Sequence, residues 1–182
     1  MRHTLIALVR DQPGVLNRVV SLFRRRGYNI ASLAVGASET AGLSRMTIVV
    51  DVGDVEQVVK QFRRLIEVAT VRSVTNERTV VRETALVKVG APAASAESRA
   101  ALRAIAAQAR AREVDAWDAA VHFEITAGPD EVSAFVGRAR EHGAVELTRS
   151  GQIAMTLGGA SFPEPQQPYF WQADGATDHV AL

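Results

Sequence analysis

Apolar and polar residues alternate in blocks along the first part of the chain. Residues 3–9 are mostly apolar and end at a turn, which predicts a buried strand. Residues 14–26 carry apolar side chains at helical spacing, and basic residues followed by Gly27 predict the end of this helix. The arginines at 24–26 could bind phosphate or an acidic partner, but a solvated helix end that complements the helix dipole also explains them.

Two strands, a helix and a further strand follow. Residues 28–37 are strand-like, and a small polar connection at 38–42 predicts a hairpin to the alternating residues 44–51, which we expect to form a half-buried strand. A second helix is expected at 54–66, where an aspartate can cap its start, and a fourth strand at 70–76. This order predicts a four-stranded antiparallel sheet with both helices on one face.

The same order recurs in the second part of the chain. The expected strands lie at 84–89, 113–117, 121–126, 144–148 and 153–157, the helices at 98–111 and 128–139, a loop at 91–95 and a turn at 118–120. The predicted fold class is therefore α+β, with two tandem ferredoxin-like βαββαβ units and an irregular C-terminal tail.

A charged stretch at 78–83 separates the two units, which places one domain at 1–78 and a second at 79–157. Residues 158–182 differ in composition, because they are rich in proline, contain no lysine or arginine, and include Tyr169-Phe170-Trp171. Such a composition is typical of a mobile tail. The aromatic trio could instead dock on a neighbouring surface.

Composition and charge narrow the classes of function. Of the 182 residues, 47% are hydrophobic and 23% are charged, as in ordinary globular proteins, and the net charge of +1 gives no field that favours nucleic acid or membranes. The chain has no cysteine, which excludes disulfides and thiolate chemistry and is compatible with the cytoplasm, where we expect the protein. No apolar stretch approaches the roughly 20 residues of a membrane span.

Catalytic patterns are absent from the sequence. There is no glycine-rich phosphate loop, and the four histidines (His3, His122, His142 and His179) do not share metal-ligand spacing. Carboxylates are scattered rather than paired, and no serine has an evident base. A spatial site could escape such a search, but the pattern favours a binding protein over an enzyme.

The turn Asp11-Gln12-Pro13-Gly14 joins the first strand to the first helix. Proline suits the first turn of a helix, and glycine lets a ligand approach the backbone closely. The exposed N–H groups of a helix start attract carboxylates. An ordinary strand-to-helix loop explains the same residues, so the turn alone does not establish a site.

Three segments resemble the small regulatory subunit of acetolactate synthase. They are Asp11-Gln12-Pro13-Gly14-Val15-Leu16-Asn17-Arg18, then Arg26-Gly27-Tyr28-Asn29-Ile30-Ala31-Ser32-Leu33, and Leu43-Ser44-Arg45-Met46-Thr47-Ile48. Residues 82–89 are similar to the start of that family's C-terminal domain, and residues 146–151 also fit. The resemblance covers 1–157 and implies that residues 1–78 form an ACT domain.

The resemblance implies an amino-acid effector, free valine, held between two ACT domains. The implied effector-binding residues are Asp11, Gly14, Val15, Leu16, Asn29 and Ile30. The helix start would meet the ligand carboxylate, while Asn29 of a second protomer offers both donors and acceptors to its polar end and Ile30 an apolar wall. Asp11 would accept from the ammonium group, or would serve only as a cap or turn residue.

The same resemblance implies a homodimer formed through the ACT domains and a partnership with the large catalytic subunit of acetolactate synthase. Thiamine diphosphate, magnesium and FAD would belong to that partner, with no cofactor and no catalytic site in this chain. The implied role is activation of the catalytic subunit in valine, leucine and isoleucine synthesis, withdrawn when valine binds. The alternatives are another amino-acid-sensing ACT regulator, an enzyme with a spatial site, and a purely structural dimerisation module.

Overall fold

The computed structural model describes residues 1–90, 95–117 and 120–158. The predicted turn at 118–120, the loop at 91–95 and the tail at 158–182 therefore lie almost entirely outside the described residues. In the described part, no helix is both long and apolar enough to cross a membrane.

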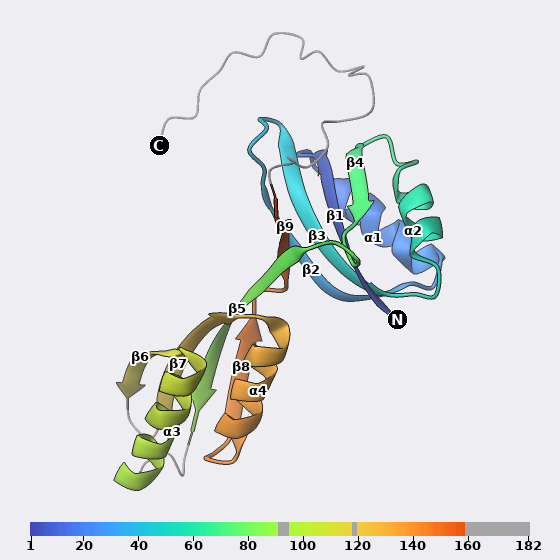
Figure 1. Ribbon diagram of the computed structural model, residues 1–182. Helices are drawn as coiled ribbons and strands as arrows, with labels where there is room; N and C mark the ends of the chain where they lie inside the picture. Colours follow the sequence, from blue (N-terminus) through green and yellow to red (C-terminus); the bar gives the residue numbers. More distant parts are fainter. Residues whose placement is uncertain (91–94, 118–119, 159–182) are drawn as a thin grey trace, which may run out of the picture.

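The first unit contains four strands and two helices in the predicted order. Its elements are β1 (Arg2–Arg10), α1 (Val15–Arg25), β2 (Asn29–Ala37), β3 (Leu43–Asp51), α2 (Val55–Phe62) and β4 (Val68–Ser73). The strands form an antiparallel sheet in the order β2-β3-β1-β4, and α1 and α2 cover one of its faces (Figure 1). This arrangement confirms the predicted fold of the unit.

Alternation along the strands explains which face meets the helices. In β1, Leu5, Ala7 and Val9 pack in one core cluster with apolar residues of both helices. At its centre, the rings of Phe23 and Phe62 meet edge-on with centroids 5.6 Å apart. The predicted cap of the second helix is also confirmed, because the Asp54 carboxylate accepts a hydrogen bond from the Gln57 N–H at 3.0 Å.

The second unit repeats this architecture. Its elements are β5 (Thr79–Val89), α3 (Ala96–Ala109), β6 (Arg112–Trp117), β7 (Ala120–Ala127), α4 (Pro129–Arg140), β8 (Val145–Arg149) and β9 (Ile153–Thr156). Strands pair in the order β6-β7-β5-β8, and a separate core forms beneath α3 and α4. The strand β9 instead pairs with the first residues of β5, Thr79–Arg82.

The strand β9 and the start of β5 lie on the helix-free face of the first sheet (Figure 1). The Ala154 N–H donates to the Thr47 hydroxyl at 3.4 Å, and Thr47 and Val49 are each only 4% exposed. The strand predicted at 44–51 is present as β3, but the prediction that it is half-buried is wrong, because both of its faces are covered. The strand β9, more than a hundred residues away in the sequence, covers the face of the sheet that the alternating pattern predicted to be exposed.

Candidate ligand-binding site

A tight corner joins β1 to α1 and carries most of the predicted site residues. Gly14 is the N-cap of α1 with φ of 86°, a left-handed conformation that favours glycine. No side chain caps this helix, and its first turn contains no acidic residue. The first N–H groups of a helix lack intrahelical acceptors, so those at this corner that the turn itself does not bind are available to a ligand.

Backbone hydrogen bonds hold the corner in place. The Asp11 N–H donates to the Gly42 carbonyl at 2.9 Å, and the Val15 N–H donates to the Gln12 carbonyl at 3.3 Å. Asp11 is therefore a turn residue and not the helix cap. Its other predicted role, as an acceptor for the ligand ammonium group, stays a prediction. Pro13 precedes the N-cap, so it shapes the turn and does not begin the helix.

An ion pair lies beside the corner. The Arg18 Nε lies 2.6 Å from the Glu67 Oε1, and the Glu67 side chain is 10% exposed. A methyl group on Gly14 would lie 3.5 Å from the Arg18 guanidinium, so this arginine sits against the glycine. Neither Arg18 nor Glu67 was among the predicted site residues. The sequence feature that could have identified Arg18 is its position one helical turn after Gly14.

The six predicted site residues divide between the two ends of the first sheet. Asp11, Gly14 and Leu16 are exposed at the corner, where the sheet ends with β1 and the start of β3. Asn29 pairs with Asp51 on β3, and Asp51 pairs with Arg2 on β1, which places Asn29 at the opposite end. Eight residues of strand separate the two ends, a distance of about 26 Å. One chain therefore does not bring the two groups together.

Burial decides what each of the remaining two residues can offer. Val15 is 4% exposed and packs in the core, so only its backbone is available at the corner. Ile30 is half-buried against the same core. Leu16, by contrast, exposes 47% of its surface beside Gly14 and provides apolar contact area there.

The outer edge of β2 is a potential pairing surface. In the described part of the chain, β2 pairs only with β3 and forms one edge of the first sheet. Its nine residues thus present backbone donors and acceptors on the other side. Such an edge is a ready template for pairing with a second chain.

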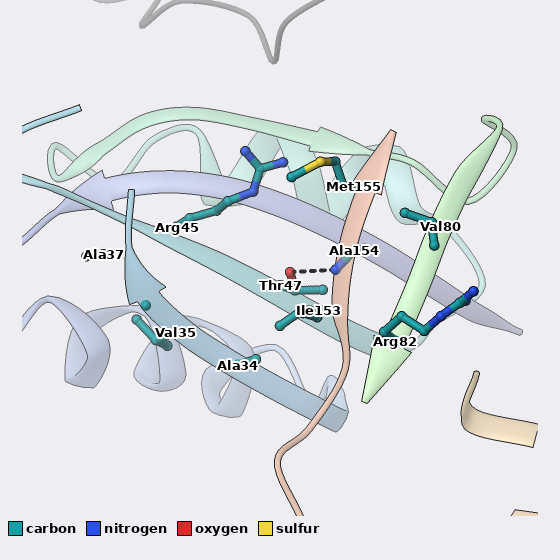
Figure 2. A pocket seen from close by; sticks show the side chains of 11 residues that line it. Ala34, Val35, Ala37, Arg45, Thr47, Val80, Arg82, Ile153, Ala154 and Met155 are labelled. Atoms are coloured by element: carbon teal, nitrogen blue, oxygen red, sulfur yellow. Dashed lines mark hydrogen bonds between the residues drawn. The ribbon is translucent and has the colours of Figure 1, made fainter. Parts of the chain in front are cut away.

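An apolar pocket of about 410 Å³ opens on the helix-free face, between β2 and β9 (Figure 2). Its lining residues are Ala34, Val35, Gly36, Ala37, Arg45, Thr47, Val80, Arg82, Ile153, Ala154 and Met155. None of the predicted site residues lines this pocket. Among the described residues, no group of three or more histidine, aspartate or glutamate side chains is placed to hold a metal ion.

Comparison with known proteins identifies the family. A model of the small subunit-like ACT domain of acetohydroxyacid synthase matches residues 5–70, and a model of the small subunit of acetolactate synthase matches residues 82–158. The chain belongs to the acetolactate synthase small-subunit family. The resemblance to that family in the sequence is thereby confirmed, and the ACT-type fold of the first unit with it.

Individual small subunits agree with this assignment. The chain is 47% identical over 160 residues to a protein of Archaeoglobus fulgidus named "Probable acetolactate synthase small subunit", covering 87% of this chain and 98% of the relative. It is 42% identical over 158 residues to the acetolactate synthase small subunit of Mycolicibacterium smegmatis, covering 86% and 91% of the two chains. The crystal structure of the Thermotoga maritima small subunit matches with a TM-score of 0.78 at 34% identity, covering 88% of this chain and 99% of that one.

Proposed function

We propose that this small subunit activates the large catalytic subunit of acetolactate synthase and withdraws that activation when it binds valine. Membership of the small-subunit family supports a regulatory role in an enzyme of branched-chain amino-acid synthesis. Thiamine diphosphate, magnesium and FAD would then belong to the catalytic partner, which performs the transferase reaction. This chain supplies the effector site and the means to change the partner's state.

The corner at the start of α1 is the proposed receptor for the amino-acid carboxylate. Gly14 adds no side chain to the corner, the Arg18 guanidinium lies beside it, and the N–H groups of the first turn after Val15 stand at the positive end of the helix dipole. The exposed Leu16 side chain suits a small apolar side chain such as that of valine. The Asp11 carboxylate lies in the same turn and can accept from the ligand ammonium group.

The site becomes complete when two copies pair through β2. Pairing about a two-fold axis makes the two β2 strands antiparallel, so the Asn29 end of one strand lies beside the Ala37 end of the other. Ala37 pairs with Ser44, which pairs with Val9, so its end of the sheet is the corner end. The partner's Asn29 and Ile30 would thereby reach the corner. The single observation that carries the proposal is this separation of the two groups within one chain.

A ligand bound between two paired chains can regulate by changing the populations of two dimer arrangements. A ligand shifts an equilibrium between two dimer arrangements only by the difference in its affinity for them. Valine that contacts both chains can bind one arrangement more tightly than the other. The two parts of its site come from different chains, so their relative position depends on how the two sheets are aligned. The catalytic subunit would then meet a different surface in the presence of valine.

Replacement of Gly14 by aspartate tests the site. Aspartate tolerates the left-handed conformation better than most residues, but its carboxylate would occupy and repel the place of the ligand carboxylate. We expect titration calorimetry to detect no valine binding to Gly14→Asp, and acetolactate formation by the catalytic partner to remain activated when valine is added.

The neutral variant Gly14→Asn is the matched control for size and backbone strain. It should retain weakened but measurable binding, at least about tenfold tighter than the aspartate variant, which corresponds to roughly 1.4 kcal/mol. Valine binding to Gly14→Asp at the wild-type affinity would refute the placement of the carboxylate. An unchanged catalytic rate on adding the wild-type chain would refute the activating role.

A further inference from the structure

The pocket between β2 and β9 is an apolar surface that the proposed effector site does not use. Val35, Ile153 and Met155 line it, yet 48–60% of the surface of each is exposed, and Leu157, just after β9, is 55% exposed. Figure 2 shows Val35, Ile153 and Met155 around the hollow, with Arg45 and Arg82 at its borders. Exposed apolar patches of this kind mark surfaces that are covered by another group.

The segment that begins at this pocket has complementary chemistry. The chain continues from Leu157 and Gly158 into residues 159–182, which lie beyond both family models. This extension contains Tyr169-Phe170-Trp171 and three acidic residues, but no lysine or arginine. Among the described residues that line the pocket, two are arginines and none is acidic.

We propose that the aromatic segment Tyr169–Trp171 folds back and docks in the pocket between β2 and β9 of its own chain. Aromatic rings supply large apolar contact areas at a small cost in side-chain entropy, and the acidic residues that follow them complement the two arginines. The occupant is thus a segment that follows the part of the chain matched by the family models, which ends at residue 158.

The connection is long enough for this return. The residues between β9 and the aromatic trio are 157–168, and a stretch of that length reaches at most about 40 Å. The pocket begins only two residues before Leu157, at Met155, so the trio remains within reach of it. A short tether also provides an effective concentration in the millimolar range, which lets a modest affinity suffice.

Cysteine cross-linking tests the proposal cleanly, because the natural chain contains no cysteine. In the full chain, the pair Met155→Cys and Phe170→Cys would join the pocket to the extension under mild oxidation. We expect an intrachain disulfide that forms at least about tenfold faster than in the control pair Leu86→Cys and Phe170→Cys. Leu86 is matched in exposure, at 54%, but lies on β5 in the second sheet.

The products separate the possible results. A disulfide within one chain at the pocket position supports the proposal, whereas equal rates for the two pairs overturn it. A disulfide that forms only between two chains also overturns it, because the extension would then occupy the pocket of a second copy. These results do not depend on valine binding, so they test the docked segment independently of the effector site.

Fluorescence gives a second measurement without new cysteines. In the Trp117→Phe background Trp171 is the single tryptophan, and Trp117 is 76% exposed, so its replacement should leave the fold intact. A docked Trp171 should emit at shorter wavelength, and the pocket variant Met155→Glu should shift the emission to the red and increase quenching by acrylamide. Emission typical of a solvated indole, unchanged by Met155→Glu, would overturn the proposal.

Discussion

At the level of single residues, two buried glutamates are each matched by one arginine from a distant part of the chain. Glu67 is paired with Arg18 of α1, and Glu83 is paired with Arg149 at the end of β8. The Arg149 guanidinium also donates to the Pro129 carbonyl at 3.3 Å, in the first turn of α4. The sequence showed these carboxylates only as scattered, because the partners become neighbours only in the folded sheets.

Removing the cation of the first pair should destabilise the protein. In Arg18→Met the stem is kept, but the Glu67 carboxylate, 10% exposed, loses its partner. Stranding a fully buried charge costs about 3–5 kcal/mol, and because Arg18 is half-exposed and water can enter, we expect roughly 2 kcal/mol in the free energy of unfolding measured by urea denaturation.

Arg2→Met is the matched control for this change. Its partner is Asp51 at 3.6 Å, and the arginine side chain is 72% exposed, so the loss should stay under about 1 kcal/mol. Equal losses in the two variants would show that the pair beside the corner is no more than a surface contact.

At the level of elements, periodicity predicted the order of strands and helices in both units but not what covers their faces. The alternation at 44–51 correctly assigned Met46 and Ile48 to the helix side. It could not show that Thr47 lies under β9, because that contact joins residues 107 positions apart. Likewise, the strand expected at 84–89 begins earlier in the structure, because Thr79–Arg82 pair with β9 and extend β5.

The docking of β9 depends on close backbone approach at Gly151. Its φ is 81°, and a methyl group there would lie 2.8 Å from the Leu33 carbonyl oxygen of β2. Gly151→Ala should therefore push β9 away from the first sheet and weaken the contact between the Gln152 N–H and the Ser32 hydroxyl, now 2.8 Å. We expect a loss of roughly 2–3 kcal/mol and faster hydrogen exchange at Ala154.

A second glycine separates the steric effect from backbone strain. Gly27 also has a positive φ, 68°, but a methyl group there meets no atom within 4 Å. Gly27→Ala should cost only about 1 kcal/mol and leave hydrogen exchange in β9 unchanged. If the amide of Ala154 exchanges at the same rate in both variants, the close approach at Gly151 does not hold β9 on the first sheet.

At the level of the whole molecule, the position of the candidate site depends on pairing register. The family resemblance supplied the six residues, but their distribution over two ends of one sheet follows only from β2, β3 and β1 being antiparallel and in register. No local pattern encodes that distance. The proposed dimer follows from this distance, and it predicts that each site takes Gly14 from one chain and Asn29 from the other.

Mixing two inactive variants tests this shared site. Gly14→Asp and Asn29→Ala should each abolish valine binding as homodimers, since every site contains the defect. In a heterodimer with one chain of each kind, both defects fall in one site and the other site is intact. Co-expression in equal amounts should restore binding at about a quarter of all sites, because half of the dimers are mixed. Calorimetry gives that stoichiometry directly. If mixing restores no binding, Gly14 and Asn29 do not belong to one site shared across the two-fold axis. The proposal that the β2-paired dimer completes the valine site would then be wrong.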